Sequence, residues 1–193
     1  MTKAIRIYEH GGPDVLKWED ITVGEPSSGE VRLKLKAAGL NFIDCYQRSG
    51  LYPMDLPLTL GAEGVGVVEA PGPGVDNLAI GQRVAFSGGE IGSYAEERLI
   101  SSNTLIPLPD SVDDQTAAAM MLKGMTAHML LFKCYPVQQN DTILVHAAAG
   151  GVGSIMCQWA NLLGAKVIGT VSSDDKADKA RANGCQHPIN YTA

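Results

Sequence analysis

The sequence Thr-Ile-Leu-Val-His-Ala-Ala-Ala-Gly-Gly-Val-Gly, residues 142–153, decides how this chain folds. Residues 142–147 have the composition of a buried strand, and residues 152–163 have the apolar spacing of a helix. Between them, Gly150 and Gly151 carry no side chain that would hold a diphosphate away from the backbone N–H groups, and the helix N-terminus adds partial positive charge. The stretch therefore predicts a dinucleotide-binding turn.

The turn departs at one position from the strict Gly-x-Gly-x-x-Gly pattern, because Ala148 stands where the pattern has its first glycine. A turn with a purely structural role is the simpler alternative. The strand, turn, helix and second strand follow one another at the expected spacing, which favours nucleotide binding. We expect Gly150, Gly151 and Val152 beside the diphosphate, and we expect Gly153 to let the helix pack closely on the sheet.

The chain on the C-terminal side of this turn continues the same alternation. Residues 166–171 form a second expected strand, residues 174–182 a second helix closed by Gly184, and residues 186–191 the start of a third strand. This βαβαβ order is one half of a doubly wound parallel sheet. We therefore expect a longer protein, in which a second half completes the domain.

The end of the second strand indicates which nucleotide is bound. NAD sites usually carry an acidic side chain here for the ribose 2′-OH, whereas Ser172, Ser173 and the nearby Lys176 suit a 2′-phosphate. Asp174 and Asp175 would repel that phosphate unless they point to solvent from the first turn of the next helix. The sequence favours NADPH over NADH on this basis.

The N-terminal part of the chain is rich in short segments with strand composition, separated by glycine and proline. The strongest of them, residues 30–38, alternates apolar and basic side chains, which is typical of a strand with one solvated face. Further strands are expected at residues 4–8, 15–19, 64–70, 82–86 and 93–100. Many short strands at this spacing indicate a small, strongly bent barrel.

A helical segment is expected after Pro109, with Ser111 as its N-cap and Asp114 in its first turn. Helical composition covers residues 117–122 and, as a second run, residues 126–132.

The composition argues against two classes of partner. The chain has 193 residues, of which 45% are hydrophobic and 19% charged, and its net charge is −6, which is poorly suited to nucleic acids. No apolar run reaches the roughly 18–20 residues that span a membrane, and residues 1–6 have no signal-peptide core. The four cysteines are far apart, so we expect a cytoplasmic protein with reduced thiols.

Five segments, in order along the chain, resemble the medium-chain dehydrogenase/reductase superfamily and, within it, the zinc-free quinone oxidoreductase (zeta-crystallin-like) branch. The segments are GGP (11–13), AGLNFID (38–44), RSGLYP (48–53), GAEGVGVV (61–68) and HAAAGGVG (146–153). The resemblance implies an α/β protein with a GroES-like barrel catalytic domain over residues 1–124, followed by the first half of a Rossmann doubly wound parallel sheet over residues 125–193. It also implies that a C-terminal segment of a longer protein completes the catalytic domain, and that the complete protein is a homodimer.

The resemblance also bears on the metal. Zinc-dependent relatives place a cysteine where Asn41 stands and a histidine where Ala62 stands, and neither residue here is a ligand that zinc prefers. Their four-cysteine lobe has no counterpart in residues 86–94. Cys45 and Glu63 together are two ligands, whereas a catalytic zinc takes three. We therefore expect no metal, and hydride transfer to an electron-poor acceptor such as a quinone.

By resemblance, Asn41, Tyr46 and Tyr52 line the quinone and nicotinamide cleft and are the candidate catalytic residues. Asn41 would donate to the quinone oxygen as negative charge develops there. Besides those of the turn and the ribose site, the implied cofactor residues are Asn41, Tyr46, Lys123, Thr126 and Met129, where the two domains would meet, and Tyr191 near the adenine. The plainer alternatives are aromatic packing for the tyrosines and a solvated charge for Lys123. Asp44 is expected to hold its turn through side-chain to backbone bonds.

Two other functions remain open on the sequence. An enoyl-thioester or enone reductase would use the same fold, the same cofactor and a metal-free site. The chain taken alone could instead be a catalytically inactive, truncated fragment. A substrate panel separates the first alternative, and titration with NADPH separates the second.

Overall fold

The computed structural model describes residues 2–192, and the chain divides into two compact units. The first unit reaches Leu122 and the second starts at Lys123. The outermost residues of the two expected domains, residues 1 and 193, lie outside the described residues.

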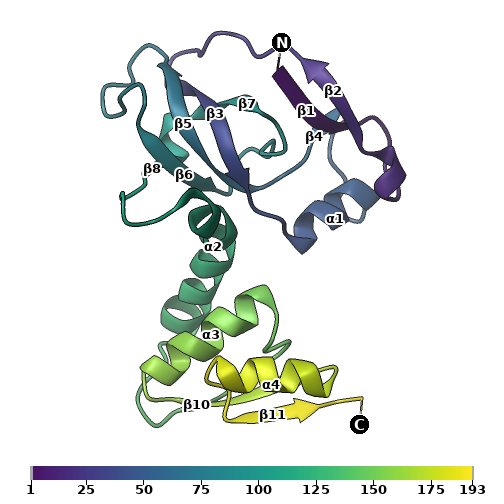
Figure 1. Ribbon diagram of the computed structural model, residues 1–193, viewed down its shortest axis with the longest axis vertical. Coiled ribbons are helices and arrows are strands. Elements are labelled where there is room, and N and C mark those ends of the chain that lie inside the picture. Colours follow the sequence, from purple (N-terminus) through teal and green to yellow (C-terminus); the bar gives the residue numbers. More distant parts are fainter. Residues whose placement is uncertain (1, 193) are drawn as a thin grey trace. The chain divides into compact units, whose positions relative to one another are not determined.

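The first unit is dominated by antiparallel sheets (Figure 1). Its strands are β1 (Thr2–Ile7), β2 (Lys17–Ile21), β3 (Glu30–Ala38), β4 (Leu58–Thr59), β5 (Glu63–Pro71), β6 (Arg83–Ser87), β7 (Glu97–Ser101) and β8 (Ile106–Pro107). They form a five-stranded sheet in the order β7-β3-β5-β6-β8 and a three-stranded sheet in the order β2-β1-β4. A β-bridge between Ala4 and Ala95 joins β1 to the segment that precedes β7. The short helices of this unit are η1 (Pro13–Val15), α1 (Phe42–Ser49) and η2 (Ser102–Thr104).

Strand β3 confirms the expected alternation of buried and solvated side chains. Val31 and Leu33 are fully buried in the core of the five-stranded sheet, whereas Lys34 and Lys36 are exposed. Arg32 lies on the polar face and pairs with the Glu25 carboxylate at 3.0 Å. The basic residues of this segment therefore form an ordinary strand face.

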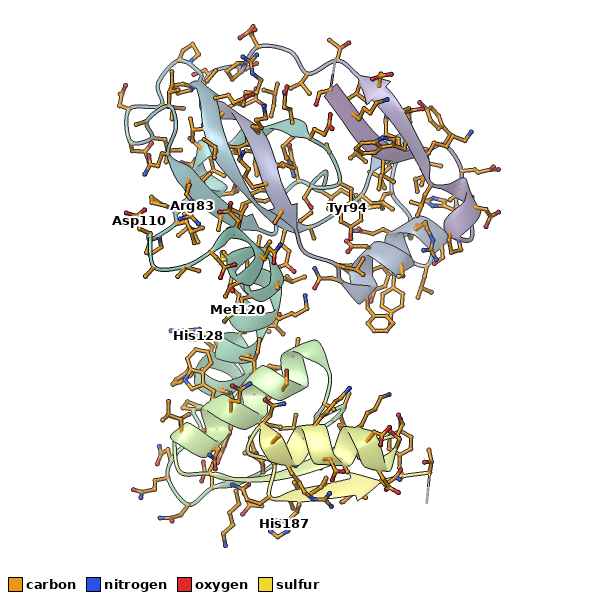
Figure 2. All side chains as sticks on the ribbon, viewed as in Figure 1. Arg83, Tyr94, Asp110, Met120, His128 and His187 are labelled. Carbon is orange, nitrogen blue, oxygen red and sulfur yellow. The ribbon has the colours of Figure 1, made fainter. Side chains whose placement is uncertain are left out.

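The helix α2 (Asp114–His128) starts two residues later than a Ser111 cap would place it, so that prediction is wrong. Asp113 caps the helix instead, because its Oδ1 accepts from the Thr116 backbone N–H at 2.8 Å and its Oδ2 from the Thr116 hydroxyl at 2.6 Å. Arg83 on β6 holds the same end, donating from Nη2 to Asp114 Oδ1 and to the Val112 carbonyl, each at 2.7 Å (Figure 2).

The two expected helical runs are one continuous helix. The residues between them, 123–125, include Gly124 but no proline, so the backbone hydrogen bonds of α2 continue at a cost of about 1 kcal/mol for the glycine. A π-helical turn, η3 (Met129–Cys134), follows directly. No helix among residues 2–192 combines the length and the apolar character needed to cross a bilayer.

The second unit has the expected βαβαβ order. Its elements are β9 (Thr142–Val145), α3 (Gly151–Leu162), β10 (Lys166–Val171), α4 (Asp174–Ala182) and β11 (His187–Asn190). The strands form a parallel sheet in the order β11-β10-β9, which is the start of a doubly wound sheet. Its core includes Val145, Cys157, Val167 and Ala180, which join both helices to the sheet.

Candidate functional site

Asn41 precedes α1 and ties the start of this helix to its first turn. The backbone N–H of Asn41 donates to Asp44 Oδ2 at 2.8 Å, and the Asp44 N–H donates to the Asn41 carbonyl at 3.1 Å. The bond from the Asn41 N–H to the Asp44 carboxylate is the half of a capping box in which the third residue of the helix binds the backbone of the N-cap residue. Asp44 thus holds its turn as expected, and the backbone of Asn41 is fixed.

Glu63, the first residue of β5, receives the side chain of Asn41. It is fully buried, with 0% of its surface exposed. Asn41 Nδ2 donates to Oε1 at 2.7 Å, and the Leu122 backbone N–H donates to Oε2 at 2.6 Å. Two donors therefore converge on separate oxygens of one carboxylate.

Sequence reasoning weighed Glu63 only as a metal ligand and missed this contact. The available signal was a single acidic residue inside the glycine- and valine-rich run 61–68, which is composed like a buried strand. A charge in such a strand needs partners, because an unpaired buried carboxylate is strongly destabilising.

Tyr94, which is labelled in Figure 2, makes a hydrogen bond to Asp44, the second buried carboxylate of the first unit besides Glu63. Its hydroxyl donates to Asp44 Oδ2 at 2.6 Å, and Asp44 is only 3% exposed. Burial raises the pKa of Tyr94 above its ordinary value, and the hydrogen bond and negative charge of Asp44 raise the pKa further. Tyr94 therefore stays protonated and acts as a donor that holds Asp44 in place.

Tyr46 and Tyr52 form an exposed aromatic group with Phe42, and we call these three residues the aromatic cluster. The Tyr46 ring lies 5.4 Å from the Tyr52 ring, edge to face, and 6.4 Å from the Phe42 ring. The exposed fractions are 38% for Tyr46, 52% for Tyr52 and 80% for Phe42. An exposed group of large apolar side chains is typical of a binding surface, and its rings suit a flat, electron-poor molecule.

The glycine-rich turn of the second unit joins β9 to α3, as the sequence predicts. Gly150 is the N-cap of α3 and has an extended backbone with φ −80°, which any residue could adopt. Gly150 and Gly151 are both exposed at the helix N-terminus, whereas Gly153 is buried. Their importance therefore lies in the space that a side chain would fill, since the backbone conformation of Gly150 does not require glycine.

The structure explains why Ala148 replaces the first glycine of the pattern. Ala147 takes the left-handed conformation at this corner, with φ 49°, and Ala148 is fully buried beneath the turn. Ala148 Cβ occupies space left open by Gly169 on β10, where an added Cβ would lie 2.5 Å away. The extra methyl group is thus accommodated on the sheet side, away from the exposed backbone.

Lys123 lies against this turn. A methyl group on Gly151 would be 2.8 Å from Lys123 Cδ and 2.9 Å from Lys123 Cε, so the stem of the lysine passes over the first residue of α3. A cation beside a helix N-terminus strengthens the attraction for an anion. Thr126 lies further along α2, and Met129 begins η3 with 48% of its surface exposed.

The predicted ribose residues gather at the carboxyl end of β10. Lys176 Nζ donates to Ser172 Oγ at 2.8 Å, and Ser173 Oγ caps α4 by accepting from the Lys176 backbone N–H at 3.3 Å. Tyr191 follows β11 at the same edge, where its N–H donates to the Val171 carbonyl at 3.1 Å and its side chain is 66% exposed. The carboxyl edge of a parallel sheet is where nucleotides bind in such folds.

The two aspartates that follow this serine pair lie in the first turn of α4 and are exposed. Asp174 Oδ1 also accepts from Asn190 Nδ2 at 3.0 Å, a bond that draws it toward β11. Water screens exposed carboxylates well, so their repulsion of a phosphate beside Ser172 is weak.

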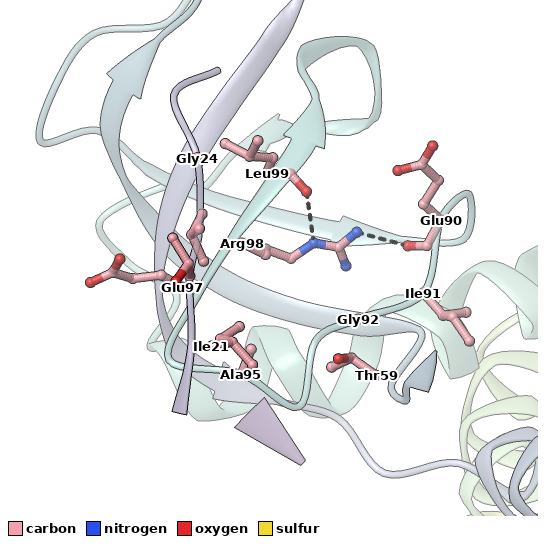
Figure 3. Close-up of a pocket in the computed structure, with 12 residues that line it drawn as sticks. Ile21, Gly24, Thr59, Glu90, Ile91, Gly92, Ala95, Glu97, Arg98 and Leu99 are labelled. Atoms are coloured by element: carbon pink, nitrogen blue, oxygen red, sulfur yellow. Dashed lines mark hydrogen bonds between the residues drawn. The ribbon is translucent and has the colours of Figure 1, made fainter. Parts of the chain in front are cut away.

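A cavity of about 290 Å³ lies elsewhere on the first unit, and none of the predicted site residues lines it (Figure 3). Arg98, at its wall, donates to the Glu90 carbonyl at 3.0 Å and the Leu99 carbonyl at 3.2 Å, and lies 5.3 Å from the Phe86 ring centre. The guanidinium thus holds the surrounding chain together. Because the carboxylate residues Glu90 and Glu97 also line the cavity, it does not favour an anion.

Among the described residues, no group of three or more His, Cys, Asp or Glu side chains could hold a metal ion. The four cysteines are free thiols, of which Cys157 and Cys185 are buried. Burial, with a contribution from neighbouring Cys185, raises the pKa of Cys157 to about 11, so this thiol is not activated as a nucleophile.

A β-rich unit followed by the first half of a dinucleotide-binding sheet is the architecture of the alcohol dehydrogenase type. Comparison with family models agrees: residues 27–110 match the alcohol dehydrogenase GroES-like domain, and residues 151–193 match the zinc-binding dehydrogenase model. The chain belongs to the medium-chain dehydrogenase/reductase superfamily, in which it corresponds to the N-terminal portion of the quinone oxidoreductases.

Individual relatives support this placement. A quinone oxidoreductase of Pseudomonas aeruginosa is 49% identical over 100% of this chain and 59% of the relative's own length. A 2-haloacrylate reductase of a Burkholderia species is 46% identical over 100% of this chain and 60% of the relative's own length. The crystal structure of the Escherichia coli quinone oxidoreductase complexed with NADPH is 43% identical over 98% of this chain and 58% of that one, with a TM-score of 0.96. The chain thus spans about 59% of the length of the curated relatives that it matches.

Proposed function

We propose that the protein that carries this chain reduces quinones with NADPH, without a metal. The observation that carries the proposal is the turn at the start of α3, where two exposed glycines leave the backbone bare and the stem of Lys123 lies against Gly151. The similarity to quinone oxidoreductases, one of them complexed with NADPH, supports it.

The residues of the second unit fit a dinucleotide phosphate. A Cβ on Gly150 would lie 3.0 Å from the Ala147 carbonyl and would fill the space above the turn, so the bare backbone suits a diphosphate. Ser172, Ser173 and Lys176 would hold the 2′-phosphate. Tyr191 would contact the adenine, and Thr126, Met129 and Val152 would complete the site together with Lys123. Bound there, the nicotinamide supplies the hydride.

The residues of the first unit suit the acceptor. The aromatic cluster offers faces and edges of rings against which a flat quinone can lie, and Tyr46 and Tyr52 add hydroxyl groups. Asn41 would donate to the quinone oxygen as negative charge develops on it. The side-chain amide carries two N–H bonds, one of which is directed at Glu63, so this role needs the other to face the acceptor.

The metal-free reaction rests on residue types. Asn41 and Ala62 stand where zinc-dependent relatives supply a thiolate and an imidazole, and neither an amide nor a methyl group replaces those ligands. Hydride transfer to a quinone proceeds without a Lewis acid, because the acceptor is already electron-poor. For the complete protein we also propose a homodimer in the cytoplasm, in line with the family resemblance and the free thiols.

Asn41→Ala in the complete protein tests the acceptor site. We expect kcat/KM for a quinone such as 1,4-benzoquinone to fall by roughly 10²-fold, because a donor to developing negative charge is lost. The variant should still bind NADPH, as followed by the fluorescence of the reduced nicotinamide. Asn77→Ala, at an exposed asparagine of the same unit, is the matched control. Full quinone reduction by the Asn41 variant would remove this residue from the mechanism.

The comparisons do not favour the alternative acceptor, an electron-poor alkene such as an enone, although one relative, at 46% identity, is a 2-haloacrylate reductase. A panel of quinones, enones and 2-haloacrylate, each measured with NADPH, decides between the two. Higher kcat/KM for the alkenes than for the quinones would assign the protein to alkene reduction.

A further inference from the structure

Thr170, on β10, lies where β9 ends and the glycine-rich turn begins. The parallel pairing of these two strands stops at Gly169 and Val145, one residue before Thr170. Beyond that point the Ala148 N–H donates to the Thr170 carbonyl at 3.0 Å, and the Ala147 N–H donates to the Thr170 hydroxyl oxygen Oγ1 at 3.2 Å. One residue of β10 thus binds two consecutive backbone N–H groups of the turn, one through its main chain and one through its side chain.

The residue bound by this hydroxyl has an unfavourable backbone conformation. Ala147 has a φ of 49°, in the left-handed region, where the Cβ of a residue other than glycine is crowded. Such a conformation persists only where the surrounding structure holds it. The Ala147 N–H is held by Thr170 Oγ1, and the Ala147 carbonyl accepts from the Gly150 N–H at 2.8 Å. Ala147 is therefore fixed from both sides.

The position of Ala147 decides where the start of α3 lies. Its carbonyl binds the N–H of Gly150, which is the N-cap of this helix. An added Cβ on Gly153 would lie 2.3 Å from the same carbonyl oxygen, so the first turn of α3 packs directly on it. A displacement of Ala147 would therefore move the backbone N–H groups at the start of α3, which are the groups proposed to bind the diphosphate.

The bond to the Ala147 N–H depends on the hydroxyl group of Thr170. Oγ1 also lies 3.2 Å from His146 Nδ1. A hydroxyl has lone pairs and one hydrogen, so it can accept from the Ala147 N–H while it donates to Nδ1 of an imidazole that carries its proton on Nε2. Valine has the shape of threonine, but its methyl group neither accepts nor donates. Serine keeps the hydroxyl and loses only the methyl group.

We propose that Thr170 is the positioning residue of the diphosphate turn, because its hydroxyl holds the Ala147 N–H and so aims the backbone N–H groups at the start of α3 toward the diphosphate of NADPH. The inference rests on the proposed function, which gives the geometry of the turn a use. Thr170 needs no contact with the nucleotide in this role. It differs in this from Ser172, Ser173 and Lys176, which would bind the 2′-phosphate themselves.

Binding measurements on the complete protein test this. Thr170→Val should raise the Kd for NADPH about three- to tenfold, which is the effect of one lost hydrogen bond on an equilibrium. Adenosine 2′-monophosphate has the adenine and the 2′-phosphate but no diphosphate, so its Kd should stay unchanged in the same variant. Thr170→Ser should bind both nucleotides like the wild type. Thr142→Val, the same change at the exposed first residue of β9, is the matched control and should alter neither Kd.

A purely structural role for Thr170 gives a different pattern. An unchanged Kd for NADPH in Thr170→Val would overturn the proposal. An equal rise in Kd for NADPH and for adenosine 2′-monophosphate would also overturn it, because the effect would then not lie at the diphosphate. The same holds if Thr170→Ser binds NADPH as weakly as Thr170→Val does.

A second readout needs neither turnover nor nucleotide. In the complete protein, hydrogen exchange of the Ala147 backbone N–H, resolved by ¹⁵N NMR, should be slow in the wild type and in Thr170→Ser and faster in Thr170→Val. Exchange of the wild-type Ala147 N–H at the rate of an unstructured peptide would overturn the proposal even if Thr170→Val does not fold. Slow exchange at Ala147 in a wild type that binds no NADPH would overturn the proposed function and support the bond to Thr170.

Discussion

Gly39→Ala is expected to lower the free energy of unfolding by roughly 3 kcal/mol or more, or to prevent folding of the first unit. The added Cβ would lie 2.2 Å from Glu63 Oε1, 2.4 Å from Glu63 Cδ and 2.3 Å from the Ala118 carbonyl oxygen. Two of these are atoms of a fully buried carboxylate and the third is helix backbone, so none can move aside cheaply. Relief requires that β3 separates from α2 or that Glu63 gives up its bonds.

Urea unfolding followed by circular dichroism measures this loss. Gly24→Ala is the matched control, because an added Cβ there meets nothing within 4 Å and the residue needs no left-handed backbone. That variant should be as stable as the wild type, or more stable by roughly 0.4–1 kcal/mol, since alanine restricts the unfolded chain. Equal unfolding midpoints for the Gly39 and Gly24 variants would contradict the packing described around Glu63.

Gly153→Ala is expected to have the second large effect, because it forces α3 away from the turn that binds the diphosphate. The added Cβ would lie 2.3 Å from the Ala147 carbonyl oxygen and 2.9 Å from Ala148 Cα, both of them backbone atoms of the turn. We expect a loss of about 2–3 kcal/mol in the free energy of unfolding, together with a loss of NADPH binding.

A substitution at the neighbouring Gly151 distinguishes the effect of the turn on stability from its effect on NADPH binding. The three atoms nearest to an added Cβ on Gly151 all belong to the side-chain stem of Lys123, and a side-chain stem shifts more easily than the backbone atoms beside Gly153. Gly151→Ala should therefore cost less than about 1 kcal/mol of stability, yet still weaken NADPH binding by crowding the turn and displacing the lysine. If the two variants were equally stable, Gly153 would not have the close packing role assigned to it.

The second unit was the more predictable from sequence. The predicted bounds of β10 and α4, residues 166–171 and 174–182, agree with the structure, because both elements are set by local patterns. The strand composition of residues 166–171 is a local property, and so is the cap of α4, in which Ser173 Oγ accepts from the Lys176 N–H three residues further on.

The predictions that were wrong or absent concern contacts between distant segments. Asp113 and Ser111 can both cap the start of α2. The choice between them depends on Arg83, which lies far away in the sequence, on β6, and binds Asp114. Glu63 is separated by 22 residues from Asn41 and by 59 from Leu122, so no local pattern reports their bonds. Such contacts follow from topology, which a periodicity argument does not contain.

The departure of the glycine turn from the strict pattern has the same origin. Ala148 in place of glycine weakens the motif when the turn is considered alone. In the structure, the methyl group of Ala148 lies next to Gly169 on β10, 21 residues further along the chain, where the absence of a side chain leaves room for it. The two positions make sense only as a pair, one in the turn after β9 and the other on the neighbouring strand β10.

The most direct test of the account is the choice of nucleotide by the complete wild-type protein. With a fixed, saturating quinone, kcat/KM for NADPH should exceed that for NADH at least tenfold or so, because Ser172, Ser173 and Lys176 provide hydroxyls and a positive charge where the 2′-phosphate would lie. Lys176→Gln should narrow that ratio. Comparable kcat/KM values for the two nucleotides, or no reduction of the quinone with either, would contradict the central claim that this turn and strand end form an NADPH site.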